Sequence, residues 1–407
     1  MGHDSAELRE RLVGQLWADG SIVSAALADA FRTVPRERFL SEVAEREGLE
    51  AVYRNEPIVT RRDGRGMPVS SSSQPTVMAL MLECLAVAPG QRVLEVGAGT
   101  GYNAALLTTL AGAGGHVTSV ELDPELAAQA GDALRRGGHR VDVVQGDGRR
   151  GWLAGAPYDR IIVTASSPDV PPAWFDQLVP GGLVELPLHL RAGMQRVVTL
   201  RKVGAGLESV ATVPGAFMAL RAGAHDPSPV AEALQASAGR GPPLVWMAGL
   251  GVDGLRPAAR RRLLALALDD SRVVPLGLRA PAEALRLYVN LAAPEAGLVD
   301  GMAHGRYRRR AGQWGGGTLG VVDGDGRGLA LLGSGPVVTR LDAWGDPGPA
   351  ELLVGLVEEW RPHGRPAEHR LQVRVGYGRA PAAWRSLRRS GCVVSFDWPP
   401  TIASHGR

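Results

Sequence analysis

The chain has 407 residues, of which 45% are hydrophobic and 21% are charged, and its formal net charge is +3. This length exceeds one typical domain and predicts two, and the composition excludes a disordered or fibrous chain. Arginine supplies nearly all of the positive charge, because Lys202 is the only lysine. We interpret this preference for arginine over lysine as a general feature of the chain, so the basic residues do not indicate nucleic-acid binding.

Cysteine usage and hydropathy predict the compartment. The two cysteines, Cys84 and Cys392, lie far apart, and neither belongs to a C-x-x-C motif or lies near a metal-type histidine pair. We therefore expect a reduced, metal-free, cytoplasmic protein. The charged N-terminus has no apolar signal core, and no uncharged run reaches transmembrane length, so we expect no membrane association.

The first 50 residues predict helices, because apolar residues such as Leu8, Leu12 and Leu16 recur at helical spacing. Short extended pieces are expected at residues 51–53 and 57–60.

Four consecutive serines, residues 70–73, precede Gln74 and Pro75. This pattern predicts a helix start, with Ser73 as the cap and Pro75 in the first turn. A serine near a helix start is more often a cap than a catalyst, and the run could also be only a polar loop.

Residues 92–122 form the unit around which the chain is organised. An apolar run at residues 93–96 predicts a buried strand, and it ends in the glycine-rich turn 97–101. A helix is expected at 102–110 and a second strand at 117–120, which closes on Glu121. Glycines let the backbone approach a nucleotide-shaped ligand, and a carboxylate at the next strand tip can accept hydrogen bonds from ribose hydroxyls.

The spacing of this turn indicates which ligand it binds. A dinucleotide site has the pattern G-x-G-x-x-G, whereas this chain has E-x-G-x-G-x-G, with Glu95 before Gly97, Gly99 and Gly101. No basic or hydroxyl cluster is placed to bind phosphates. An acidic residue at the mouth of the site favours a cationic, phosphate-free ligand such as S-adenosylmethionine. The alternative is an ordinary glycine-rich turn between a strand and a helix.

Helices and strands continue to alternate after this unit. We expect helices at 123–136 and 170–178, and strands at 141–144, 158–165, 183–187 and 195–200. Alternation of this kind predicts an α/β fold, a doubly wound, mostly parallel Rossmann-like sheet preceded by a helical segment, with the ligand at the carboxyl edge.

With these pieces in order, residues 1–220 closely resemble the protein-L-isoaspartate O-methyltransferase family. The motifs that carry the resemblance are VPRERFL, SSSQPTVMALML, VLEVGAGTGYNAALL, SVELDPELA, GDGRRG and VPGGLVELPL. The S-Q-P segment is more specific to that family than the glycines are. The family usually has a Thr-Ile or similar pair where this chain has Ser71 and Ser72, which puts a preference for isoaspartate in doubt.

The resemblance implies a role for individual residues. Ser73 matches the family's active-site hydroxyl. The implied S-adenosylmethionine site comprises Glu95, Gly97, Gly99 and Gly101 around the methionine part, Glu121 at the ribose, Leu122, Asp147 and Gly148 at the adenine, and Thr164 beside the reacting centre.

The implied chemistry is methylation of an aspartate or isoaspartate carboxylate in a peptide or protein. With a pKa near ~4, such a carboxylate is already ionised at neutral pH, so no strong general base is required and catalysis is mainly positioning. The methyl ester can then close to a succinimide through attack by the next backbone nitrogen.

Residues 221–407 predict an accessory α+β domain. Helices are expected at 231–238, 258–268, 281–291 and 351–360, and strands at 244–248, 273–276, 317–322, 328–332, 337–341, 371–375 and 393–396. Histidines 304, 363 and 369 have no ligand spacing, so we expect no metal. The arginine-rich run 306–310 is either a solvated face or a contact for an acidic peptide. Five tryptophans, Trp246, Trp314, Trp344, Trp360 and Trp398, are expected mostly in the core, although one or two could line a peptide groove.

The extra domain separates three hypotheses. This arrangement is similar to that of methyltransferases that tailor ribosomally made peptides, such as lanthipeptides and graspetides. The resemblance implies methylation of an aspartate in a cyclised precursor peptide, which leads to an aspartimide, and an extra domain that binds this peptide. The alternatives are general isoaspartate repair and a non-catalytic scaffold that only binds S-adenosylmethionine.

Overall fold

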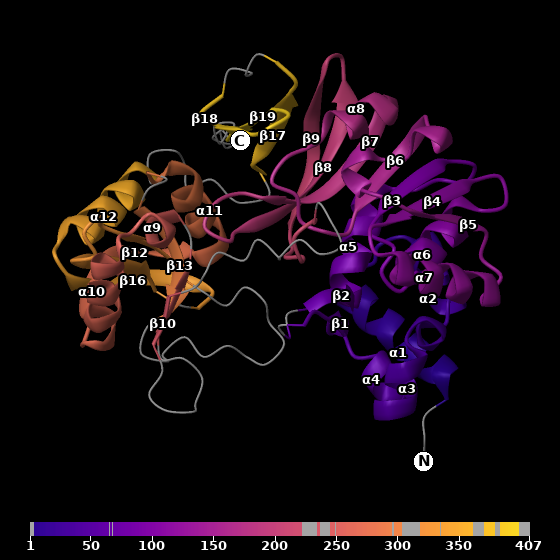
Figure 1. The fold of residues 1–407 in the computed structure, drawn as a ribbon, viewed down its shortest axis with the longest axis horizontal. Helices are drawn as coiled ribbons and strands as arrows, with labels where there is room; N and C mark the ends of the chain where they lie inside the picture. Colours follow the sequence, from indigo (N-terminus) through magenta and orange to yellow (C-terminus); the bar gives the residue numbers. More distant parts are fainter. Residues whose placement is uncertain are drawn as a thin grey trace, which may run out of the picture.

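The computed structural model describes residues 4–64, 66, 68–221, 234–236, 245–248, 250–294, 297–302, 318–333, 335–360, 370–378 and 383–398. It contains two large β-sheets, each covered by helices, and Figure 1 shows them side by side. Within these residues, no helix is both long and apolar enough to cross a membrane.

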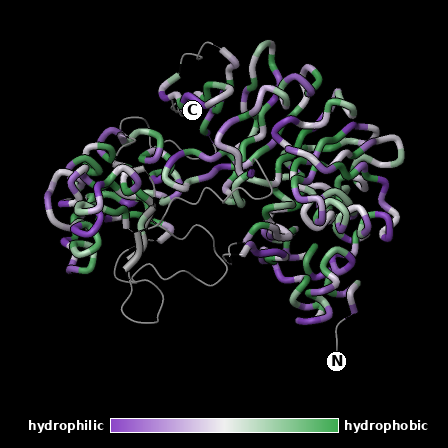
Figure 2. The backbone as a smooth tube through the Cα atoms, in the orientation of Figure 1, coloured by the Kyte–Doolittle hydropathy of each residue, from purple (hydrophilic) through white to green (hydrophobic). Residues whose placement is uncertain are grey.

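The N-terminal segment is helical, as the sequence predicts. Its elements are α1 (Ser5–Ala18), α2 (Ala25–Thr33), a 3-10 helix η1 (Arg36–Phe39), α3 (Ser41–Glu47) and α4 (Leu49–Val52). The Ser24 hydroxyl caps α2 by accepting from the Leu27 amide at 3.3 Å. These helices alternate hydrophilic and hydrophobic stretches in Figure 2, because each buries one face. The extended structure expected at residues 51–53 is wrong, since α4 includes Ala51 and Val52.

The first sheet has ten strands in the order β18-β19-β17-β9-β8-β7-β6-β3-β4-β5. Its strands are β3 (Arg92–Val96), β4 (His116–Glu121), β5 (Val141–Gln145), β6 (Tyr158–Val163), β7 (Leu178–His189), β8 (Gln195–Val203), β9 (Gly206–Pro214), β17 (Gln372–Gly376), β18 (Arg385–Arg388) and β19 (Val393–Asp397). The run from β5 to β7 is parallel, and the remaining pairs are antiparallel.

Helices cover both faces of the parallel part. They are α5 (Pro75–Leu85), α6 (Tyr102–Ala111), α7 (Pro124–Arg136) and α8 (Pro172–Gln177). Val93 packs with α5 and α6 on one face, whereas Leu94 packs with Trp174 of α8 on the other. Neighbouring strand residues point to opposite faces, so this arrangement confirms the doubly wound prediction.

A two-stranded hairpin precedes α5. Its strands, β1 (Ile58–Arg62) and β2 (Pro68–Ser72), pair in an antiparallel register. Ser70 and Ser72 belong to β2, so most of the four-serine run is strand.

The second sheet is antiparallel and has seven strands in the order β10-β11-β13-β14-β15-β16-β12. Its elements are β10 (Leu234–Ala236), β11 (Val245–Ala248), α9 (Leu250–Asp253), α10 (Pro257–Leu268), β12 (Arg272–Pro281), α11 (Ala282–Ala292), β13 (Leu298–Met302), β14 (Thr318–Val322), β15 (Gly328–Leu332), β16 (Val337–Gly345) and α12 (Gly348–Trp360). Helices α9 and α10 pack on one face and α11 and α12 on the other.

The division expected at residue 220 does not separate the two sheets. Strands β17, β18 and β19 extend the first sheet from its β9 edge, although they come from the end of the chain. Helix α11 also packs on both sides, with Leu291 in the core of the first sheet and Leu285 in that of the second. Residues 221–407 are therefore joined to the first sheet by strand pairing and by side-chain packing.

The structure of residues 221–407 differs from the prediction in some elements and does not describe others. The helix expected at 231–238 is wrong where it can be checked, because residues 234–236 form β10. Strands β13 and β18 were not predicted. Histidines 304 and 363 and 369, Trp314 and the run 306–310 lie outside the described residues.

Candidate functional site

The glycine turn lies directly after β3 and has the backbone that only glycine adopts easily. Gly97, Gly99 and Gly101 have φ angles of 100°, 52° and 86°. The Thr164 hydroxyl donates to the Gly97 carbonyl at 2.8 Å. A Cβ on Gly97 would lie 2.6 Å from that same hydroxyl oxygen. The turn is therefore fixed on one side by Thr164, which follows β6.

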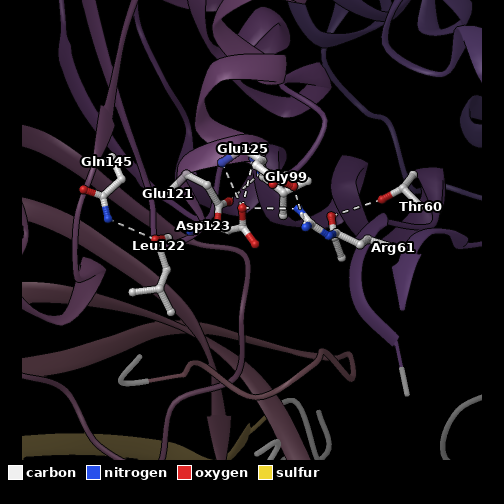
Figure 3. A network of polar contacts seen from close by, with 10 residues as sticks. Thr60, Arg61, Gly99, Glu121, Leu122, Asp123, Glu125 and Gln145 are labelled. Carbon is white, nitrogen blue, oxygen red and sulfur yellow. Dashed lines mark hydrogen bonds and ion pairs between the residues drawn. The ribbon is translucent and has the colours of Figure 1, made fainter. Parts of the chain in front are cut away.

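Glu121 lies at the tip of β4, opposite this turn (Figure 3). Its carboxylate accepts from the Gly99 amide at 3.0 Å and from the Asp123 amide at 3.2 Å. Each carboxylate oxygen can accept more than one hydrogen bond, so capacity remains for two hydroxyl donors. This geometry suits a ribose at the place where the resemblance puts it.

Glu95 lies on β3, and its side chain is buried and not exposed at the mouth of the site; its expected role at the methionine part of a cofactor stays a prediction. Glu95 is fully buried, and its carboxylate accepts from the Asn103 amide at 2.8 Å and from the Ser119 hydroxyl. Burial raises the pKa of Glu95 to about 7. These two hydrogen bonds brace β3 against β4 and α6.

The residues expected around the adenine follow β4 and β5. The Leu122 carbonyl accepts from the Gln145 side chain at 3.2 Å (Figure 3). Partial burial opposes ionisation of Asp147, but hydrogen bonds from Arg149 hold the pKa of this carboxyl below its usual value. Gly148 packs so closely on β3 that a Cβ would lie 2.3 Å from Val96. Its carbonyl accepts from the Trp174 ring nitrogen at 2.8 Å, which fixes the loop.

The serine segment lies against the glycine turn. A Cβ placed on Gly99 would lie 3.6 Å from the Ser71 carbonyl oxygen and 4.0 Å from the Ser70 hydroxyl oxygen, so a methyl group on this glycine would already be in contact with β2. Ser73 is half-buried, and it is not the cap of α5. That position is Gln74, and no side chain caps this helix. The prediction that Ser73 caps this helix is therefore wrong, and its hydroxyl is not used for capping.

Sequence reasoning missed Arg36, which holds the serine segment from inside the protein. This side chain is fully buried, and one of its terminal nitrogens donates to the Ser72 hydroxyl at 3.1 Å and to the Ser73 carbonyl at 3.0 Å. The other donates to the Val52 carbonyl at 3.0 Å. Only the VPRERFL motif could have drawn attention to it.

The same contact explains the departure at Ser72. Ser72 is buried and its hydroxyl is bound by Arg36, so this residue contributes to the support of the segment and not to a substrate-facing wall. The two-serine replacement therefore has a structural reason at one of its positions.

The described part of the chain holds no group of three or more histidine, cysteine or acidic side chains placed to bind a metal ion. The turn, Glu121, Thr164 and the Ser71 backbone do come together at one edge of the first sheet. Backbone cradle and acceptor carboxylate together fit an uncharged ribose next to a flexible, phosphate-free chain.

Comparison with known proteins agrees with this geometry. The profile of the family described as protein-L-isoaspartate(D-aspartate) O-methyltransferase (PCMT) matches residues 7–221. The chain is 38% identical over 223 residues to protein-L-isoaspartate O-methyltransferase of Hyperthermus butylicus, covering 53% of this chain and 88% of that one. It is 42% identical over 182 residues to the enzyme of the same name from Methanopyrus kandleri, covering 44% of this chain and 76% of that one.

One solved structure is similar over nearly the whole length. It is a protein-L-isoaspartate O-methyltransferase with a TM-score of 0.52 and 26% identity, covering 95% of this chain and 99% of that chain. This match extends beyond residue 221, so a protein of that name also has a region that corresponds to the accessory half.

Proposed function

This chain belongs to the protein-L-isoaspartate(D-aspartate) O-methyltransferase family, and we propose that it methylates the free carboxylate of isoaspartyl residues. As a member it is an S-adenosylmethionine-dependent methyltransferase that acts on a peptide or protein. The observation that carries the proposal is the proximity of the serine segment to the glycine turn, where a Cβ on Gly99 would be in contact with the Ser71 carbonyl oxygen. It brings a hydroxyl-bearing segment next to the place expected for the cofactor.

We assign the cofactor to the turn 97–101 and Glu121. When bound there, S-adenosylmethionine supplies an electrophilic methyl group. The turn backbone lies against it and the Glu121 carboxylate accepts from its ribose, while Leu122, Asp147 and Gly148 border its base. Glu95 acts from behind by holding β4 in register through Ser119.

The substrate carboxylate needs orientation more than activation. It is ionised at neutral pH, so the reaction requires no base with an unusual pKa. The Ser73 hydroxyl donates a hydrogen bond that holds the carboxylate while leaving it ionised. Arg36 fixes the Ser73 carbonyl, and thereby the direction of that hydroxyl.

A second candidate is tailoring of a cyclised, ribosomally made peptide, in which an aspartate ester closes to an aspartimide. The observation that favours it is the second sheet, which lies outside residues 7–221 and gives the chain surface that methyl transfer alone does not require. The solved structure that is similar over 95% of this chain is a protein-L-isoaspartate O-methyltransferase, and for this reason we place isoaspartyl methylation first.

The test offers three peptides to the full chain with S-adenosylmethionine: one with isoaspartate, its aspartate twin, and a cyclised aspartate peptide. Mass spectrometry follows methyl gain and loss of water. We expect methylation of the isoaspartyl peptide, slowed about fivefold in Ser73→Ala because one hydrogen bond worth ~1 kcal/mol is lost. The matched control is Ser71→Ala. Turnover of the cyclised peptide alone would establish tailoring, and bound cofactor without any turnover would indicate a scaffold.

A further inference from the structure

The β1–β2 hairpin lies close to two parts of the cofactor site. On its β2 side, the hairpin lies so near the glycine turn that a Cβ on Gly99 would be 3.6 Å from the Ser71 carbonyl oxygen. The two strands are tied to each other by their register and by the Thr60 hydroxyl, which lies 3.0 Å from that of Ser70. A ligand seated on the glycine turn would therefore have this hairpin as a neighbour.

On its β1 side, Arg61 reaches from the hairpin to the start of α7 (Figure 3). Its guanidinium lies 3.2 Å from the Asp123 carboxylate and 2.6 Å from that of Glu125. Asp123 is the N-cap of α7, and its amide donates to Glu121. Arg61 is thus one residue removed from the carboxylate that we assign to the ribose.

We propose that Arg61 is a positioning residue that holds the hairpin across the cofactor site and slows exchange of the cofactor. The inference rests on the proposed location of S-adenosylmethionine. With β2 against the glycine turn and β1 fastened to α7, the hairpin spans the site between two fixed points. A bound cofactor leaves only after one of these attachments gives way.

The neighbouring arginine provides the contrast. Arg62 donates to the Gly66 carbonyl at 2.9 Å, which is a bond within the hairpin. It has the same charge and lies on the same strand, but its bond to Gly66 does not fasten the hairpin to α7. Removing Arg61 should loosen the hairpin at α7, whereas removing Arg62 should not.

The exposure of the ion pairs predicts their response to salt. The side chains of Arg61, Asp123 and Glu125 are 35%, 16% and 70% exposed, so solvent ions screen them in part. A three- to tenfold change in a rate that requires both pairs to break corresponds to ~0.6–1.4 kcal/mol, which lies within the range for two exposed ion pairs.

The experiment loads the full chain with radiolabelled S-adenosylhomocysteine, adds excess unlabelled compound, and follows release by filter binding. We expect Arg61→Gln to release the label about three- to tenfold faster than the wild type, Glu125→Gln to fall in between, and Arg62→Gln to match the wild type. Added salt should speed release from the wild type and leave Arg61→Gln unchanged. Thermal unfolding of each variant checks that it is folded.

Release from Arg61→Gln at the wild-type rate would overturn the inference, and so would equal acceleration by Arg62→Gln. A wild type that binds no S-adenosylhomocysteine would overturn the proposed cofactor site as well, so the two failures are distinguishable.

Discussion

Replacement of Glu95 by glutamine should stabilise the protein more at alkaline pH than at acidic pH. Glu95 is completely buried, and burial raises its pKa from 4.5 to about 7. Glutamine has the same shape, can accept from Asn103, and can donate to the Ser119 hydroxyl. The variant therefore removes the ionisation while keeping the hydrogen bonds.

The sign follows from which state binds the proton more tightly. In the unfolded chain Glu95 ionises near 4.5, whereas in the folded protein it keeps its proton until about 7. Stability is therefore lost as pH rises across this window. A difference of that size corresponds to ~3 kcal/mol once pH exceeds the folded value.

Urea unfolding followed by circular dichroism measures this difference. Relative to the wild type, we expect the free energy of unfolding of Glu95→Gln to be higher by ~1 kcal/mol at about pH 5 and by ~3 kcal/mol at about pH 8. Burial also raises the pKa of Glu185, whose effect has the same sign. Because Glu185 is present in both proteins, subtracting one curve from the other isolates Glu95. A difference that stays constant with pH would refute the reasoning.

Three further predictions concern local geometry. Gly97→Ala should abolish cofactor binding, because its Cβ would clash with the Thr164 hydroxyl. Gly90 has a similar φ but no neighbour within 4 Å, so Gly90→Ala should cost only ~1 kcal/mol of stability and leave cofactor binding unchanged. Equal losses of cofactor affinity in the two variants, measured by calorimetry, would contradict the clash. Burial raises the pKa of Cys84 to about 11, so iodoacetamide should alkylate it only after unfolding, and prompt alkylation of the native protein would count against this. Trp174→Phe should lose ~1–2 kcal/mol and weaken cofactor binding, because it frees the Gly148 carbonyl; unchanged stability in thermal unfolding would count against that role.

The parts of the fold that the sequence predicts well are those with strong local patterns. Strand β3, the glycine turn, α6 and β4 each have apolar runs or glycines whose meaning depends little on the rest of the chain. The same holds for β15, expected at residues 328–332 and found there. Residues 51–53 were misassigned because a short apolar stretch does not distinguish a strand from one helical turn.

What the sequence could not predict depends on contacts between distant residues. Nothing near residues 370–398 indicates that β17 pairs with β9, since that pairing depends on the tertiary arrangement. In the same way, the E-x-G-x-G-x-G motif does not predict that the Glu95 side chain is buried, because that burial depends on its contacts with Asn103 and Ser119. Arg36 was missed because an arginine in a charged motif predicts a surface position, and only the structure shows the backbone carbonyls that it binds.

The central claim of this account is that Glu121 and the glycine turn bind S-adenosylmethionine. Titration calorimetry of the full chain with S-adenosylhomocysteine tests it most directly, with Glu121→Gln as the variant and the exposed Asp132→Asn on α7 as the control. We predict that Glu121→Gln lowers the affinity at least about tenfold, or ~1.4 kcal/mol, and that the control matches the wild type. Equal affinity in Glu121→Gln and the wild type would contradict the claim.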